Sequence, residues 1–100
     1  MAITIPYKAL YAFDNKVLLY RKGNFYISEN GNIYFLIKSP LSFAKRIAAK
    51  TNILNRLMRL EPRAIEKFSN NLFVMSFEHK IWVLDIEKKT MHMIFENRPG

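Results

Sequence analysis

Short apolar runs separated by two-residue turn signals are the feature that most constrains the fold of this 100-residue chain. The first part of the chain contains four such runs, at 8–13, 16–21, 25–28 and 32–38. The last part contains four more, at 64–68, 72–77, 80–86 and 91–96. Asp14-Asn15 is a good turn, and Asn30-Gly31 is the strongest kind of short hairpin signal. The pattern predicts two antiparallel β-meanders.

The stretch from Ser39 to Arg63 differs from both meanders, because its apolar residues recur at helical spacing. Ser39 is the expected N-cap, Pro40 suits the first helical position, and Pro62 ends the helix. Weak helix formers at 51 and 52 allow a break in the middle. The stretch therefore predicts an amphipathic helix whose apolar face consists of Phe43, Ala44, Ile47, Leu54, Leu57 and Met58.

The predicted strands carry apolar residues on both faces. In 80–86, for example, Ile81 and Val83 point one way while Trp82 and Leu84 point the other. Strands of this kind belong in stacked sheets that are covered on both sides. We therefore expect Trp82 to be at least partly buried, together with a largely buried core of Ile33, Phe35, Ile47, Leu54, Leu57, Leu72, Val74, Ile81, Val83 and Leu84.

The two halves share an internal repeat. Residues 24–37 align with 72–85, so that residues 33–36 fall on 81–84 at an offset of 48 residues. A strand–turn–strand unit that recurs at such a period is typical of propeller blades, which have four antiparallel strands each. Two unrelated hairpins with a common pattern are the alternative interpretation.

The run Ile81-Trp82-Val83-Leu84-Asp85, followed by the polar turn 87–90, resembles the third strand and turn of a propeller blade. The preceding NRLMRLEPRA also resembles a linker of bacterial propeller proteins of the sialidase-like, BNR-repeat kind. The resemblance covers roughly residues 16–100 and implies a propeller, which needs about four or more blades to close. The chain would then be an N-terminal fragment, assemble with other copies, or have its sheet completed by the helix. The WD dipeptide and the Asp-box of those families are absent, so no catalytic residue is carried over.

Together these patterns predict a mainly β fold, in which antiparallel meanders resembling propeller blades flank one amphipathic helix. We expect a single domain or fragment over residues 1–100. Its parts are the first meander at 1–38, the helix and linker at 39–63, and a second four-stranded meander at 64–96.

Positive charge is concentrated on the predicted helix. The chain has a net charge of +8, and residues 38–63 hold seven Lys and Arg against one Glu. The helix face could contact phosphate on nucleic acid or on a membrane surface, or it could be a solvated face with a positive bias. On nucleic acid, Lys45, Arg56 and Arg59 should contact phosphates without base preference. The full set of candidate anion or nucleic-acid contacts is Lys45, Arg46, Lys50, Arg56 and Arg59.

No residue pattern indicates a reaction. The chain has no cysteine, which excludes thiolate chemistry and suits a reducing, cytoplasmic compartment. His79 and His92 lack the spacing of metal ligands, and there is no Gly-rich phosphate loop. We expect no catalytic residue, no cofactor and no metal. The N-terminus lacks the pattern of a secretory signal, and no stretch of about 20 residues is free of charge, so no transmembrane segment is predicted.

Three functions remain open on the sequence. The first is a non-catalytic β-repeat interaction module, part of a larger propeller or assembly, with a protein partner or self-association. The second is a small basic nucleic-acid-binding domain that uses the helix face. The third is a fragment of a glycan-acting enzyme, which rests on the resemblance alone.

Overall fold

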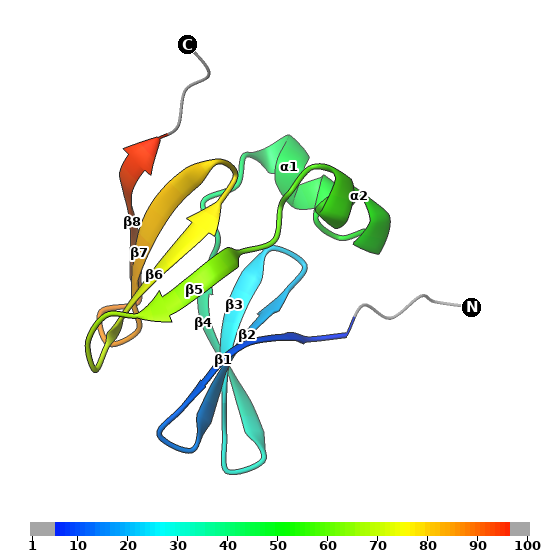
Figure 1. The fold of residues 1–100 in the computed structure, drawn as a ribbon. Helices are drawn as coiled ribbons and strands as arrows, with labels where there is room; N and C mark the ends of the chain where they lie inside the picture. The colour runs from blue at the N-terminus through cyan, green and yellow to red at the C-terminus, as the bar shows by residue number, and fades with distance from the viewer. Residues whose placement is uncertain (1–5, 97–100) are drawn as a thin grey trace.

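The computed structural model describes residues 6–96, so residues 1–5 and 97–100 of the predicted ranges lie outside it. The described part folds into two β-meanders joined by two short helices (Figure 1). The first meander comprises β1 (Lys8–Phe13), β2 (Lys16–Arg21), β3 (Asn24–Glu29) and β4 (Asn32–Lys38). The connection contains α1 (Phe43–Ala48) and α2 (Asn52–Leu57). The second meander comprises β5 (Arg63–Lys67), β6 (Leu72–Phe77), β7 (Lys80–Asp85) and β8 (Thr90–Glu96).

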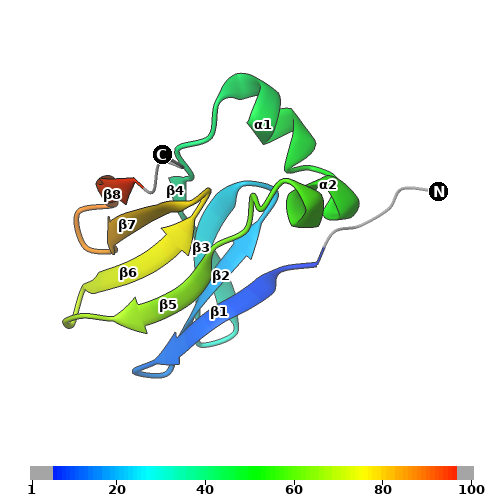
Figure 2. The same cartoon turned by 45° about the horizontal axis from the view of Figure 1, so that its top comes forward.

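The prediction of a mainly β fold with two antiparallel meanders on either side of a helical connection is confirmed. Each meander is an antiparallel four-stranded sheet whose strand order follows the sequence, β1-β2-β3-β4 and β5-β6-β7-β8. The first strands of the two sheets, β1 and β5, lie side by side (Figure 2). Each predicted strand agrees with the observed one to within a residue at either end.

Two-residue turns build the hairpins. Four of them have positive φ at both central residues, as type I′ turns require: Asp14-Asn15, Lys22-Gly23, Asn30-Gly31 and Glu78-His79. Type I′ turns match the right-handed twist of the strands that they join. They therefore fix the register of four of the six strand pairs.

The connection holds two helices where one was predicted, and the break falls at the weak helix formers. Ser42 caps α1 by accepting from the Lys45 amide at 3.4 Å, and Thr51 caps α2 by accepting from the Leu54 amide at 3.3 Å. The prediction that Ser39 is the N-cap is therefore wrong. Its hydroxyl instead donates to the Gly23 carbonyl at 2.6 Å.

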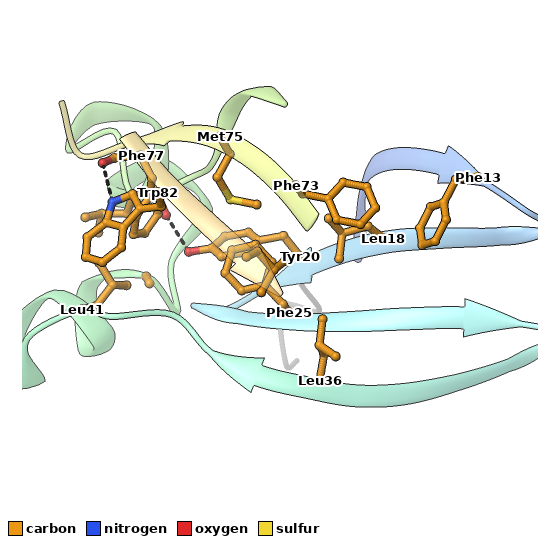
Figure 3. Packing of buried hydrophobic residues seen from close by; sticks show 13 residues of the cluster. Phe13, Leu18, Tyr20, Phe25, Leu36, Leu41, Phe73, Met75, Phe77 and Trp82 are labelled. Atoms are coloured by element: carbon orange, nitrogen blue, oxygen red, sulfur yellow. Dashed lines mark hydrogen bonds between the residues drawn. The ribbon is translucent and has the colours of Figure 1, made fainter. Parts of the chain in front are cut away.

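The core lies between the two sheets (Figure 3). Aromatic rings meet edge to face across this interface, as in the pair Phe13–Phe73, with ring centroids 5.0 Å apart. The connection closes the core with three buried residues, Leu41, Ala49 and Leu60. The sheets contribute Phe13, Leu18, Tyr20, Phe25, Leu36, Phe73, Met75, Phe77, Trp82 and Leu84.

The predicted core is only partly correct. Trp82 and Leu84 are buried as expected, but other predicted residues of the second meander are only half-buried, namely Leu72, Val74, Ile81 and Val83. The prediction is wrong for five exposed residues: Ile33, Phe35, Ile47, Leu54 and Leu57. The first two lie on β4, which is an edge strand with one neighbour. The other three lie on helices that contact the core through other residues.

The two sheets bury opposite faces of equivalent strands. Matching strands by their place in each sheet pairs β2 with β6 and β3 with β7, so Lys16 falls on Leu72 and Asn24 on Lys80, an offset of 56 residues. The core residues of β2 are then at its third and fifth positions, while those of β6 are at the second, fourth and sixth. Leu19, at the fourth position of β2, is also buried, but on the other face and outside this core. In β3 the second position is fully buried, whereas in β7 the third and fifth are buried. The sheets are thus stacked front to back.

This relation differs from the predicted repeat. The 48-residue offset equates the β3–β4 hairpin with the β6–β7 hairpin, and these occupy different places in their sheets. The structural repeat is therefore the whole sheet, with an offset of 56 residues between equivalent strands. Front-to-back stacking also leaves each sheet with one face that the other sheet does not cover. On the second sheet, alternation and register put Val74, Ile81, Val83 and Phe95 on that face.

Tyr20 links the first sheet to the end of the connection. Its buried hydroxyl donates to the Leu60 carbonyl at 2.5 Å, and burial raises the pKa of the phenol above its ordinary value. Replacing Tyr20 with phenylalanine should leave that buried carbonyl without its donor. We expect a loss of about 1–3 kcal/mol in the free energy of unfolding, measured by urea denaturation. A variant as stable as the parent would show that the hydrogen bond contributes nothing net.

Candidate functional site

The β2–β3 turn packs against the residues that flank α1. The backbone amide and the hydroxyl of Ser39 both donate to the Gly23 carbonyl, at 2.9 and 2.6 Å. Gly23 has a φ of +80°, and a Cβ there would lie 3.4 Å from Cδ1 of Leu41 and 3.6 Å from Cβ of Ala49. Glycine suits both the turn conformation and this close approach. The turn therefore holds its other central residue, Lys22, beside the helical connection.

A basic groove of about 330 Å³ lies at this turn, between α1 and the end of β4. Arg46 crosses it, with its guanidinium donating to the Asn24 side-chain oxygen and to the Ser39 carbonyl, both at 2.9 Å. Four cations and no carboxylate line the groove among the described residues. We call it the helix groove, and its lining consists of Lys22, Asn24, Lys38, Phe43, Arg46, Ile47 and Lys50.

A second basic groove, of about 340 Å³, adjoins the first. Arg21 stacks over the ring of Tyr7 with its guanidinium carbon 5.0 Å from the ring centroid, and Tyr7 meets Tyr26 edge to face at 5.1 Å. We call it the amino-terminal groove, lined by Pro6, Tyr7, Lys8, Tyr20, Arg21, Lys22, Asn55, Arg56 and Glu61. Its carboxylate, on Glu61, accepts from Lys8 at 2.8 Å. Lys22 lines both grooves, so the two linings share one cation.

Two buried polar atoms of the amino-terminal groove have unused hydrogen-bonding capacity. Asn55 is buried and its amide nitrogen donates to the Ala49 carbonyl at 2.8 Å, which ties α2 to the end of α1. Its side-chain oxygen and the Nε of Arg21 have no partner within residues 6–96. Such groups are uncommon in folded proteins. Both belong to residues that line the amino-terminal groove.

The five predicted contact residues do not form one surface. Arg46 and Lys50 line the helix groove, and Arg56 lines the amino-terminal groove. Arg59 lies elsewhere, beside the β6–β7 turn. Lys45 forms an ion pair of 2.6 Å with Glu78, whose side chain is almost fully buried. Lys45 is therefore engaged within the fold.

The first sheet contributes cations to both grooves that were not among the predicted contact residues. Lys22 and Lys38 line the helix groove with Arg46 and Lys50, and Arg21 lines the neighbouring groove. The charge count over residues 38–63 includes Lys38 but not Lys22 or Arg21. One sequence feature could have indicated these residues. Lysines in a turn or at a strand end lie at the edge of the sheet, where they can approach the basic helix if it packs against that edge.

Two classes of site are not observed in the described residues. Between residues 6 and 96, no cluster of histidine, aspartate and glutamate has the arrangement needed to hold a metal ion. None of the helices described there is long and apolar enough to cross a membrane.

The chain was also compared with known proteins. No protein-family model, curated protein or solved structure matches it.

Proposed function

We propose that the chain is a non-catalytic β-repeat interaction module, which self-associates by stacking the free face of its β5–β8 sheet on the free β1–β4 face of a second copy. The observation that carries this proposal is the front-to-back relation of the two sheets. The contact would repeat, between copies, the one that already exists within the chain.

Front-to-back stacking supports this proposal because it is a heterologous arrangement. Each contact joins the β5–β8 face of one copy to the β1–β4 face of the next. The two copies then still have one free β1–β4 face and one free β5–β8 face, to which further copies can bind. Stacked four-stranded sheets of this kind close into propellers when enough of them are present. The proposed assembly is therefore propeller-like, with each chain supplying two sheets.

The chemistry of the free faces also supports stacking. On the β5–β8 sheet, Ile81 lies between Ser76 and Phe95, and Val83 lies between Val74 and His92. On the β1–β4 sheet, Tyr26 pairs with Phe35, which is 52% exposed, and with Leu19, which is buried. Apolar side chains that remain exposed on a sheet face commonly mark interaction sites, because burying them removes apolar area from water.

Replacing Ile81 with glutamate should weaken self-association. A charge on this central strand would be buried without a partner in the stacked state but hydrated in the monomer. We expect an increase of about tenfold or more in the dissociation constant measured by sedimentation equilibrium. The matched control is Ile53→Glu on α2, where the parent side chain is 71% exposed and lies off both sheets.

Two further measurements distinguish a lost contact from a lost fold. Thermal melts establish that Ile81→Glu remains folded, and Phe95→Glu repeats the test at a more exposed position on the same face. A parent chain that stays monomeric at all concentrations would exclude self-association. Equal weakening by the Ile53→Glu control would show that the free sheet face is not the contact.

A further inference from the structure

We infer that the two grooves form one binding site for single-stranded nucleic acid. The site is a basic track defined by Arg21, Lys22, Lys38, Arg46, Lys50 and Arg56. It runs through both grooves and is continuous at Lys22, which lines both of them. No residue of the track belongs to the β5–β8 sheet, but Arg21 lies on the same face of β2 as Leu19, so the track borders the β1–β4 face that the proposed self-association uses. The two proposals are tested separately, because the salt dependence is tested at Lys22 and Lys50 and the self-association at Ile81 and Phe95.

The fold holds the track in place from several elements. Lys22 is on the β2–β3 turn, which is clamped by the two Ser39 hydrogen bonds. Arg46 comes from α1 and is oriented by Asn24 and by the Ser39 carbonyl. Arg56 comes from α2, which is tied to α1 through Asn55. Cations held by separate elements of one rigid region lose less conformational freedom on binding than cations on a flexible tail.

Little negative charge opposes the track. Within the described lining of both grooves, Glu61 is the sole carboxylate, and Lys8 already neutralises it at 2.8 Å. A row of cations without neighbouring carboxylates produces a positive potential that attracts a polyanion and is screened by salt. The ligand that this potential fits is a chain of phosphates long enough to pass from one groove to the other.

The aromatic residues favour a single strand. Phe43 lines the helix groove with 81% of its surface exposed, and Tyr7 lines the amino-terminal groove. Proteins that bind single strands combine a cationic groove for the phosphates with aromatic rings on which unpaired bases stack. The cations here line hollows and do not project from a single flat surface. This shape suits a flexible strand better than the plane of a lipid bilayer.

The test uses fluorescence anisotropy with a labelled oligothymidine and a labelled oligouridine, titrated at several salt concentrations. Replacing Lys22 and Lys50 with glutamine should remove two phosphate contacts. The slope of log affinity against log salt should then flatten by about 1.4, since each contact on a single strand contributes about 0.7. The matched control is Lys88→Gln with Lys89→Gln in the β7–β8 turn, which makes the same charge change away from the grooves and should leave the slope almost unchanged.

A second substitution separates stacking from charge. Phe43→Ala should weaken binding by about tenfold without changing the salt slope, because it removes a stacking surface and no charge. The matched control is Phe68→Ala, since Phe68 is 74% exposed and lies after β5, outside both grooves. Thermal melts of all variants confirm that the fold is retained.

Several outcomes would overturn the inference. One is an absence of oligonucleotide binding by the parent at low salt. Another is an equal flattening of the salt slope in the Lys22 and Lys50 variant and in the Lys88 and Lys89 control. That result would mean that the oligonucleotide is attracted by the overall positive charge of the chain and not by the grooves. Tighter binding to a duplex of the same sequence would contradict the role given to unpaired bases. Binding to phosphatidylserine vesicles without binding to oligonucleotides, lost in the Lys22 and Lys50 variant, would assign the track to lipid.

Discussion

Replacing Phe73 with alanine is expected to reduce the free energy of unfolding by about 3–5 kcal/mol. Phe73 is fully buried on β6 at the interface between the sheets. Its ring meets Phe13 and Tyr11 of β1 edge to face, with centroids 5.0 and 5.6 Å apart. Truncation would remove these aromatic contacts and leave a cavity between two sheets that share no strand pairing in the described residues. A chain of this size has about 5–15 kcal/mol of stability in total, so the loss would be large.

The control is the same substitution at Phe68, where about three quarters of the side chain is already exposed. We expect Phe68→Ala to change stability by less than about 0.5 kcal/mol. Urea denaturation followed by the fluorescence of Trp82 reports on both variants, because Trp82 is buried at the same interface. Similar losses in the two variants would mean that the inter-sheet interface does not hold the fold together.

The sheets could be predicted because their signals are local. Turns such as Asn30-Gly31 and Asp14-Asn15 require residues that tolerate positive φ, and such residues stand out in a sequence. Short strand-like runs that are separated by two-residue turns predict antiparallel hairpins. The way in which the sheets stack could not be predicted, because it depends on which face of each strand is buried. Since the strands are apolar on both faces, the sequence pattern fits either choice.

The orientation of the helices was predicted wrongly for a physical reason. Helical periodicity identifies an apolar side, but it assumes one continuous helix that packs along its length. The helix is broken at Thr51 into α1 and α2, and all six apolar positions of the predicted face are exposed. Contacts with the core come from Leu41 before α1, Ala49 between the helices and Leu60 after α2. The linkers, more than the helices, attach this connection to the sheets.

The site was only partly predictable for a related reason. The charge count located the positive region correctly, because Arg46, Lys50 and Arg56 do line the two grooves. It could not identify Lys45 as engaged with Glu78, which is 33 residues away in the chain. It also could not bring Lys22 to the helices, since that contact depends on the hydrogen bonds from Ser39 to Gly23. Contacts between residues distant in sequence have no local pattern.

Replacing Leu60 with alanine is expected to destabilise the chain by about 2–5 kcal/mol, although Leu60 lies outside every helix and strand. Its side chain is fully buried in the core, and its backbone amide donates to the Asn55 carbonyl at 2.8 Å. Its carbonyl accepts from the Tyr20 hydroxyl. Truncation would open a cavity where α2, the first sheet and the start of β5 meet.

The control is Leu57→Ala, three residues earlier, because Leu57 belongs to the apolar side of the predicted helix but is 75% exposed. If the linkers attach the connection to the sheets, Leu57→Ala should change stability by less than about 0.5 kcal/mol while Leu60→Ala costs several times more. If the amphipathic side packed on the sheets instead, the order would reverse. Chemical denaturation of the two variants distinguishes these arrangements, because both remove the same atoms and differ only in what surrounds them.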